Sequence, residues 1–149
     1  MEIRRREVGF TLIEIVLVLV IGVAAYLLIL AIPMRGASTA DLKAAARGLA
    51  SGLRQAQTIA MATKRDTALT LDLDTREYTV TGDDTVRQLA KELDLKLFTA
   101  QSEATSERRG AIRFYPDGSS TGGRITVASG ERKYLVDVDW ITGRVYITD

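Results

Sequence analysis

The sequence predicts an α+β fold, in which a long N-terminal helix, membrane-spanning in its first half, packs on an antiparallel head of two β-sheets. Three patterns indicate this fold: an apolar run at 10–32, apolar residues at helical spacing within 33–64, and short alternating runs over 65–149. Short strands separated by turns are typical of two packed sheets. We therefore expect a transmembrane helix, an amphipathic continuation of that helix, and a β-rich head, in this order.

The composition excludes most enzyme chemistry. The 149 residues include no histidine and no cysteine, which removes histidine-based and thiol catalysis, disulfides, and metal sites built on imidazole or thiolate. We predict no catalytic residue, no metal, no cofactor and no small-molecule substrate. Basic residues number 20 and acidic residues 19, and this balance argues against nucleic acid as a partner.

Residues 10–32 have the length and composition of a transmembrane helix. No charged side chain occurs from Ile15 to Ile32, and the apolar run extends back to Phe10 with Glu14 as its only interruption. A helix of these 23 residues rises about 34 Å, enough to cross a hydrocarbon core of about 30 Å. A buried helix of a soluble protein is the alternative, although such helices are seldom this long and this uniformly apolar.

The arginines near the N-terminus set the expected orientation. Arg4, Arg5 and Arg6 precede the apolar run, whereas only Arg35 and Lys43 follow it closely. Positive charge stays on the cytoplasmic side, so the N-terminus is predicted to be cytoplasmic and the head to face outward. A secretory signal peptide also begins with basic residues, but this apolar run exceeds the usual length and no Ala-x-Ala site ends it.

The stretch from Gly9 to Glu14 reads Gly-Phe-Thr-Leu-Ile-Glu and lies directly behind the short basic leader. It resembles the class III signal of type IV pilins and type II secretion pseudopilins. The resemblance implies that a prepilin peptidase removes residues 1–9 by cleavage after Gly9 and methylates the new N-terminus, Phe10. It also implies that Glu14 is the carboxylate used in assembly, that the membrane is the inner membrane, and that the head is periplasmic.

The spacing of Phe10 and Glu14 supports a role in assembly. Residues four apart lie on one face of a helix, and cleavage would place an ammonium group on Phe10. A charge inside the bilayer is costly when alone and much less so when paired. Glu14 is therefore expected to pair with the ammonium group of a neighbouring helix. A pair within one chain, and a carboxylate that only reaches the membrane interface, are the alternatives.

Helical periodicity returns after the apolar run. Pro33 is expected to kink the helix where it leaves the membrane, because proline removes one backbone hydrogen bond. One apolar stripe then follows helical spacing: Leu42, Ala45, Ala46, Leu49, Leu53, Ala56 and Ala60. The stripe predicts a helix that packs on the core of the head, and a free coiled-coil seam is the alternative.

Beyond residue 65 the apolar period changes to two. Leu69, Leu71 and Leu73 alternate with polar residues, and Tyr78 and Val80 follow after a turn, so this region predicts a β-hairpin. Segment 85–93 is ambiguous and fits a short helix, and the polar stretch 101–110 is predicted to be a mobile loop. Further strands are expected at 93–97, 111–115, 124–128, 133–139 and 144–148.

Two features of the head resemble functional motifs, but we interpret both as parts of the fold without a catalytic or binding role. Residues 118–124 have the glycine spacing of a phosphate-binding loop, but Arg124 replaces the required lysine and the next segment reads as a strand. Residues 115–118, Tyr-Pro-Asp-Gly, predict a tight turn instead. Asp137 and Asp139 share one face of a predicted strand, and we expect them to be solvated rather than catalytic.

Two stretches of the head extend the resemblance. Phe114–Gly118 and Thr142–Val145 are similar to the H-type pseudopilins of type II secretion (the GspH/FimT family), whose head is type IV pilin-like. This implies a minor pseudopilin, a structural subunit near the pseudopilus tip that helps to export folded proteins across the outer membrane. Its partners would be other pseudopilins, the prepilin peptidase and inner-membrane lipid. The alternative is a FimT-like minor pilin of a type IV pilus, which could bind DNA in natural transformation.

DNA binding by the head would need several basic side chains on one surface. From Pro33 onward the chain has 17 basic and 16 acidic residues, and Glu103, Glu107 and Asp117 dilute the best basic region. We therefore expect no more than weak non-specific contact with DNA. The arginines that could form a patch are Arg108, Arg109, Arg113, Arg124 and Arg144.

Overall fold

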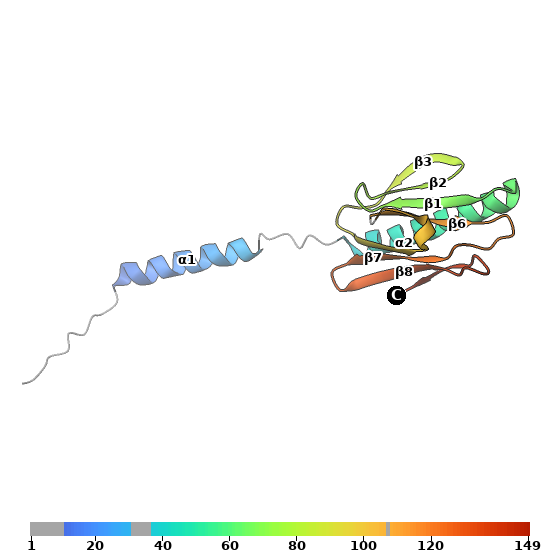
Figure 1. Ribbon diagram of the computed structural model, residues 1–149. Helices are drawn as coiled ribbons and strands as arrows, with labels where there is room; N and C mark the ends of the chain where they lie inside the picture. Colours follow the sequence, from blue (N-terminus) through green and yellow to red (C-terminus); the bar gives the residue numbers. More distant parts are fainter. Residues whose placement is uncertain (1–10, 31–36, 107) are drawn as a thin grey trace, which may run out of the picture. The chain divides into compact units, whose positions relative to one another are not determined.

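The computed structural model describes residues 11–30, 37–106 and 108–149, and the chain divides into two units, 1–35 and 36–149. The first unit holds helix α1 (Leu12–Leu30). In its described residues, the second unit holds helix α2 (Thr39–Thr63) and nine β-strands (Figure 1). The kink expected at Pro33 lies outside the described residues.

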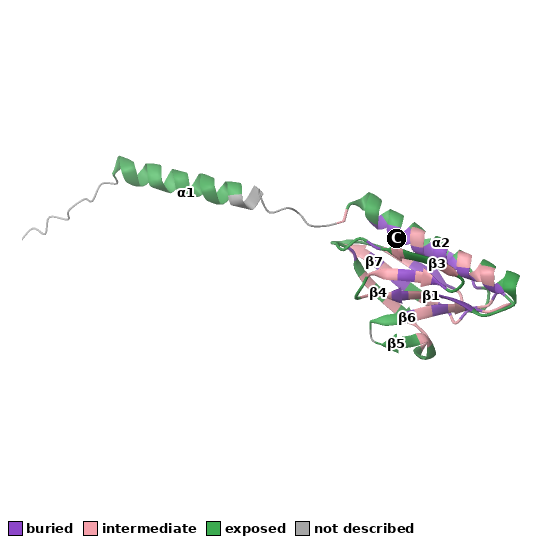
Figure 2. Ribbon diagram, turned by 90° about the horizontal axis from the view of Figure 1, so that it is seen from above, coloured by how far each residue is buried: buried purple, intermediate pink, exposed green. Residues whose placement is uncertain are grey.

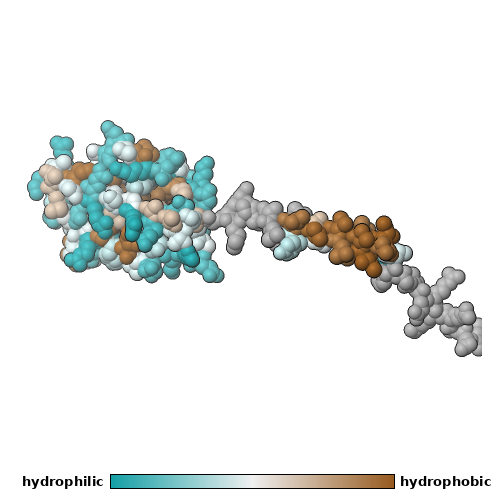
Figure 3. Space-filling view, turned by 180° about the vertical axis from the view of Figure 1, so that it is seen from behind, coloured by the Kyte–Doolittle hydropathy of each residue, from teal (hydrophilic) through white to brown (hydrophobic). Residues whose placement is uncertain are grey.

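Helix α1 is apolar on all sides. Its one charged residue is Glu14, in the first turn, and every side chain described in it, residues 12–27, is exposed. Figure 3 shows the resulting apolar surface of the helix. Within the described part of the chain, no helix reaches the length and apolarity that a membrane crossing requires.

Helix α2 begins with an N-cap of its own. The Ser38 hydroxyl accepts a hydrogen bond from Asp41 N (3.1 Å), and the Asp41 carboxylate accepts one from Ser38 N (3.2 Å). This reciprocal capping box satisfies two backbone N–H groups at the helix start. The amphipathic helix predicted for 33–64 therefore starts at Thr39, because Ser38 adopts an extended conformation (φ −61°, ψ 156°) to form the cap. Lys64, with a left-handed backbone, ends the helix.

The strands form two antiparallel sheets, as predicted. One sheet has the order β3-β2-β1-β6-β5 and the other β4-β7-β8-β9. The predicted hairpin is β1–β2, in which Leu69 pairs with Val80 and Leu71 with Tyr78. The strands are β1 (Thr67–Asp72), β2 (Glu77–Val80), β3 (Asp83–Gln88), β4 (Asp94–Thr99), β5 (Ala104–Ser106), β6 (Arg109–Phe114), β7 (Gly123–Ser129), β8 (Arg132–Val138) and β9 (Val145–Thr148).

Helix α2 contacts both sheets and joins their cores. It packs against β1, β2 and β6 of the first sheet and against β7, β8 and β9 of the second (Figure 1). All seven residues of the predicted apolar stripe are buried, as the purple side of α2 in Figure 2 shows. A Cβ atom on Gly52 would lie 3.0 Å from Leu69 Cδ1 and 3.1 Å from Tyr78 Cε2, so the glycine permits close packing. Docking on the core is confirmed, and a free coiled-coil seam is excluded.

The short helix expected within 85–93 is wrong, because this region contributes to edge strand β3. Three polar side chains fasten β3 to α2: Arg87 Nη2 donates to Asp83 Oδ2 (2.7 Å) and to Gln55 Oε1 (3.2 Å), and Gln55 Nε2 donates to Asp83 Oδ2 (2.8 Å). Hydrogen bonds from Thr85, Arg87 and Gln55 hold the pKa of Asp83 well below its ordinary value. The carboxylate is therefore charged at neutral pH, where it accepts all of these bonds.

The segment 101–110, expected to be a mobile loop, contains regular structure. A 3₁₀ turn, η1 (Gln101–Glu103), leads into β5, and Ala104 pairs with Gly110 at the start of β6. Glu103 also forms an ion pair with Arg113 of β6. These contacts with β6 order a stretch whose local sequence is polar and lacks alternation.

Leu49 provides a direct test of the packing of α2. Because Leu49 is fully buried, Leu49→Asp places an unpaired charge in the core and should remove more than about 4 kcal/mol of stability. We expect a fragment of residues 36–149 carrying this change to be unfolded by circular dichroism, whereas the exposed control Lys43→Asp stays folded. A folded Leu49→Asp fragment would contradict the observed packing.

Candidate assembly site

Glu14 is a carboxylate at the start of an otherwise apolar helix. Glu14 N donates to Thr11 Oγ1 (3.3 Å) and to Thr11 O (3.0 Å), so Thr11 caps α1. A carboxylate in the first turn also interacts favourably with the helix dipole. Its exposed side chain adjoins Ile15 and Val18. The other predicted processing residues, Gly9 and Phe10, lie outside the described residues.

In the head, the two stretches that carry the family resemblance meet at Gln57 of α2. Gln57 Nε2 donates to Gly118 O (2.9 Å) and to Thr142 O (3.3 Å). The turn predicted at 115–118 is confirmed, since Gly118 N donates to Tyr115 O (2.9 Å) and Gly118 has a positive φ of 91°. The two stretches therefore fix loops on α2. The sequence did not identify Gln57 as a contact residue, because a single polar residue beside an apolar stripe does not mark its partners.

The turn between β8 and β9 is organised by Asp139. Its carboxylate accepts hydrogen bonds from Thr142 N (2.8 Å), Thr142 Oγ1 (2.8 Å) and Ile141 N (3.1 Å), and these bonds lower the pKa of Asp139. Asp137, expected to be solvated, is instead buried (7% exposed) and accepts a 2.5 Å hydrogen bond from Arg124 Nε. Both carboxylates thus have structural partners.

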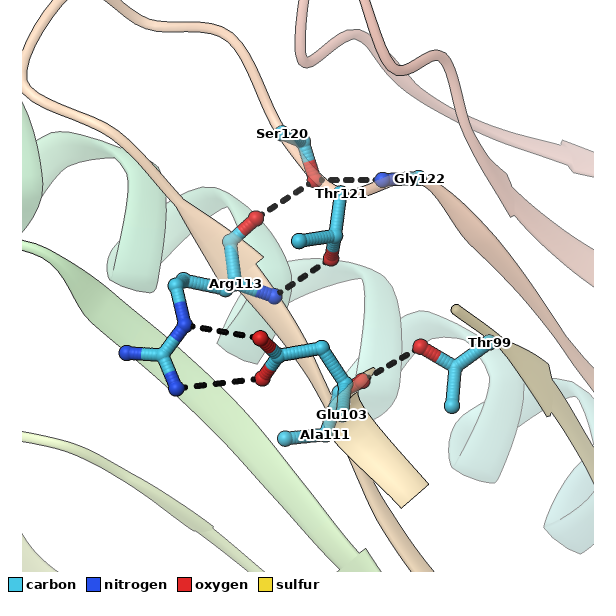
Figure 4. Close-up of polar contacts among 7 residues, drawn as sticks. All are labelled: Thr99, Glu103, Ala111, Arg113, Ser120, Thr121 and Gly122. Atoms are coloured by element: carbon cyan, nitrogen blue, oxygen red, sulfur yellow. Dashed lines mark hydrogen bonds and ion pairs between the residues drawn. The ribbon is translucent and has the colours of Figure 1, made fainter. Parts of the chain in front are cut away.

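The stretch with the spacing of a phosphate-binding loop uses its hydroxyl groups within the fold (Figure 4). Ser120 Oγ donates to Arg113 O (2.7 Å), Thr121 Oγ1 accepts from Arg113 N (3.0 Å), and Gly122 N donates to Ser120 Oγ (3.0 Å). Strand β7 follows, so this loop does not lead into a helix whose N-terminus could hold a phosphate. Nor do the described residues contain a group of three or more acidic side chains placed to hold a metal ion.

Three of the five arginines considered for DNA binding are paired with carboxylates. Arg113 holds Glu103 in a two-point contact, Nε to Oε1 (2.9 Å) and Nη2 to Oε2 (3.1 Å), which Figure 4 shows. Arg124 binds Asp137, and Arg108 binds Asp74. These pairs cancel much of the positive charge that a phosphate backbone would need.

An apolar helix with one carboxylate in its first turn, and a second helix between two antiparallel sheets, define a pilin-like protein. Two solved structures share this fold. The minor pseudopilin EpsH from the type 2 secretion system of Vibrio cholerae aligns over 72% of this chain and 96% of its own, with 14% identity and a TM-score of 0.58. The type IV minor pilin FimU of Pseudomonas aeruginosa aligns over 72% and 93%, with 13% identity and a TM-score of 0.56.

Sequence comparison separates the two kinds of pilin-like protein. The family model "Type II transport protein GspH" matches residues 45–143. "Type II secretion system protein H" of Xanthomonas campestris pv. campestris is 32% identical over 143 residues, which cover 96% of this chain and 84% of the relative. The chain therefore belongs to the GspH family, the minor pseudopilins of type II secretion, as the resemblance implied. The FimT-like alternative is not favoured.

A substitution of Gly143 tests the junction at which the loops of Gly118 and Thr142 bind Gln57. Its φ is +62°, and a Cβ atom there would overlap Gly118 O and Gln57 Nε2. Gly130 has a similar φ of +61° but open space around it, so Gly130→Ala carries only the backbone strain, about 1 kcal/mol. We expect Gly143→Ala to lower the urea midpoint clearly more than Gly130→Ala does. Equal losses would mean that the junction does not constrain the two loops.

The paired arginines predict weak DNA binding. The unit 36–149 should bind duplex DNA with a dissociation constant of roughly 10⁻⁴ M or weaker at physiological salt. Fluorescence polarisation from low to physiological salt measures this constant, with Arg144→Ala as the comparison. Micromolar binding that Arg144→Ala abolishes would contradict the prediction and favour a DNA-uptake role.

Proposed function

We propose that this minor pseudopilin is a structural subunit near the tip of the pseudopilus and helps to export folded proteins across the outer membrane. Membership in the GspH family supports the proposal. The observation that carries it is the exposed apolar helix α1 with a single carboxylate, since such a surface suits packing against other helices. The role proposed is mechanical rather than enzymatic.

Before assembly, residues 10–32 hold the chain in the inner membrane in a single pass, with the N-terminus cytoplasmic and the head periplasmic. The uncharged apolar sequence from Ile15 to Ile32 and the arginines that precede it support this arrangement. Lipid covers the apolar surface of α1 in this state, and the helices of other pseudopilins replace that lipid in the filament.

Processing by the prepilin peptidase creates the group that Glu14 needs as a partner. Cleavage between Gly9 and Phe10 leaves an ammonium group on Phe10, which is then methylated. In an apolar surrounding, Glu14 and the ammonium group of a neighbouring pseudopilin are each costly alone and favourable together. The pair sets the axial register of one helix against the next.

Gly9→Val should block removal of the leader, because a peptidase site fitted to a residue without a side chain excludes valine. We expect the variant to keep residues 1–9 by intact-mass measurement in cells with an active prepilin peptidase. The control Gly22→Val, which adds the same side chain to the middle of α1 where a Cβ has open space, should be processed normally. Retention of the leader by the parent chain would refute the assignment of the cleavage site.

Glu14→Leu should leave membrane insertion intact, since it removes an unfavourable group from an apolar segment. It should strongly reduce crosslinking to other pseudopilins and the secretion that depends on them. The control Val18→Leu changes a side chain one turn away without changing charge, and should behave like the parent. Crosslinking of Glu14→Leu at the parent level would show that Glu14 has no pairing role.

A further inference from the structure

The exposed aromatic side chains of the head gather on one sheet. Of the seven aromatic residues in 36–149, three are classed as exposed: Phe98 (77%), Trp140 (66%) and Tyr146 (46%). Phe98 belongs to β4 and Tyr146 to β9, and Trp140 lies two residues beyond the end of β8, all in or beside the same four-stranded sheet. The other sheet exposes none of its aromatic residues.

Strand register aligns these residues in a row. Phe98 pairs with Arg124, Arg124 with Asp137, and Asp137 with Tyr146. Directly paired residues in neighbouring strands lie on the same face, so the row crosses all four strands, over about 14 Å at the usual strand spacing. Their neighbours Ile125, Val136 and Val145 point to the opposite side and are buried in the core, which places the row on the outer face.

Trp140 lies beside the residue that leads into β7. Gly122 precedes Arg124 by two residues, and a Cβ atom on Gly122 would lie 3.0 Å from Trp140 Cβ. Ser120 N donates to Trp140 O (2.9 Å), and the bonds to Asp139 fix the turn that follows. The aromatic side chain is therefore carried by a well-bonded backbone.

The charges on this surface cancel. Arg124 Nε donates to Asp137 Oδ1 at 2.5 Å, and the side chain of Asp137 is only 10% exposed. Trp, Tyr, Phe and Arg are enriched at protein–protein interfaces, and Trp, Tyr and Arg are enriched among the residues that contribute most to binding energy. We call the surface formed by Phe98, Arg124, Asp137, Trp140 and Tyr146 the aromatic face.

We propose that the aromatic face docks the head of another pseudopilin through an apolar surface without net charge. The inference rests on the proposed function, which supplies neighbouring pseudopilins as partners. Because Arg124 and Asp137 neutralise each other, the five residues of the aromatic face together have no net charge to attract an anionic or a cationic partner. The exposed aromatic area favours a partner that can bury it.

The test uses the full-length chain in its native host. Tagged chain is recovered from detergent-solubilised membranes, and co-purified pseudopilins are quantified by mass spectrometry. We expect the double variant Phe98→Ser/Trp140→Ser to lose roughly ten-fold or more of its pseudopilins. The control Val86→Ser, at an exposed apolar residue of β3 (56% exposed), should lose none. Both should keep the parent's thermal midpoint, and recovery by the parent should change little between low and high salt.

A photoreactive phenylalanine analogue in place of Phe98 identifies the occupant. An adduct with another pseudopilin is expected, whereas an adduct only with a second copy of this chain, or with a glycan, overturns the proposal. Undiminished recovery by the double variant, or loss of the complex at high salt, also overturns it. If the parent itself recovers no pseudopilin, the proposed function fails rather than this assignment alone.

Discussion

Burial of the apolar stripe of α2 between the two sheets is the interaction on which the head depends. Each sheet has one apolar face, and α2 covers part of both. A direct polar link between the sheets is the hydrogen bond from Thr99 Oγ1 to Ala111 O (2.6 Å). The flanks of the same helix then bind more distant elements, through Arg54 to Val145 O (3.1 Å) and through Gln57 to two loops. Loop positions therefore follow from helix packing.

Four arginines of the head form ion pairs with carboxylates of the head in the described residues. Arg87 pairs with Asp83 of its own strand, Arg124 of β7 with Asp137 of the neighbouring β8, and Arg113 of β6 with Glu103 of the 3₁₀ turn η1. Such pairs contribute modestly to stability at the surface, but they also remove positive charge from surfaces that could otherwise attract anions. EpsH and FimU both share the fold of this chain, so the fold alone does not separate the two kinds of subunit, whereas the sequence comparison does.

The elements with strong periodicity were predictable from the sequence. The stripe from Leu42 to Ala60 and the hairpin at Leu69–Val80 repeat at 3.6 and 2 residues, and both form as expected. Strand β3 and segment 101–106 were not, because their order comes from contacts with Gln55 and Arg113 rather than from local pattern. Segments without apolar alternation give no periodic signal to read.

The site residues likewise divide into those with a local sequence signal and those defined by distant contacts. Glu14 was found because it interrupts an apolar run, which is a local signal. Gln57 was missed because its two partners lie 61 and 85 residues further along the chain. Asp137 was wrongly expected to be solvated, because the strand pattern predicts on which face of the sheet it lies but not that Arg124 covers it. Gly9 and Phe10 remain predictions from the motif.

The capping box at Ser38 starts the helix of the head with groups that belong to the head itself. Because the side chains of Ser38 and Asp41 accept bonds from the N–H groups of Asp41 and Ser38, these two groups need no preceding helical turn to supply acceptors. The start of this helix is thus encoded by residues of the head itself, and sequence changes in residues 1–35 leave both capping groups in place.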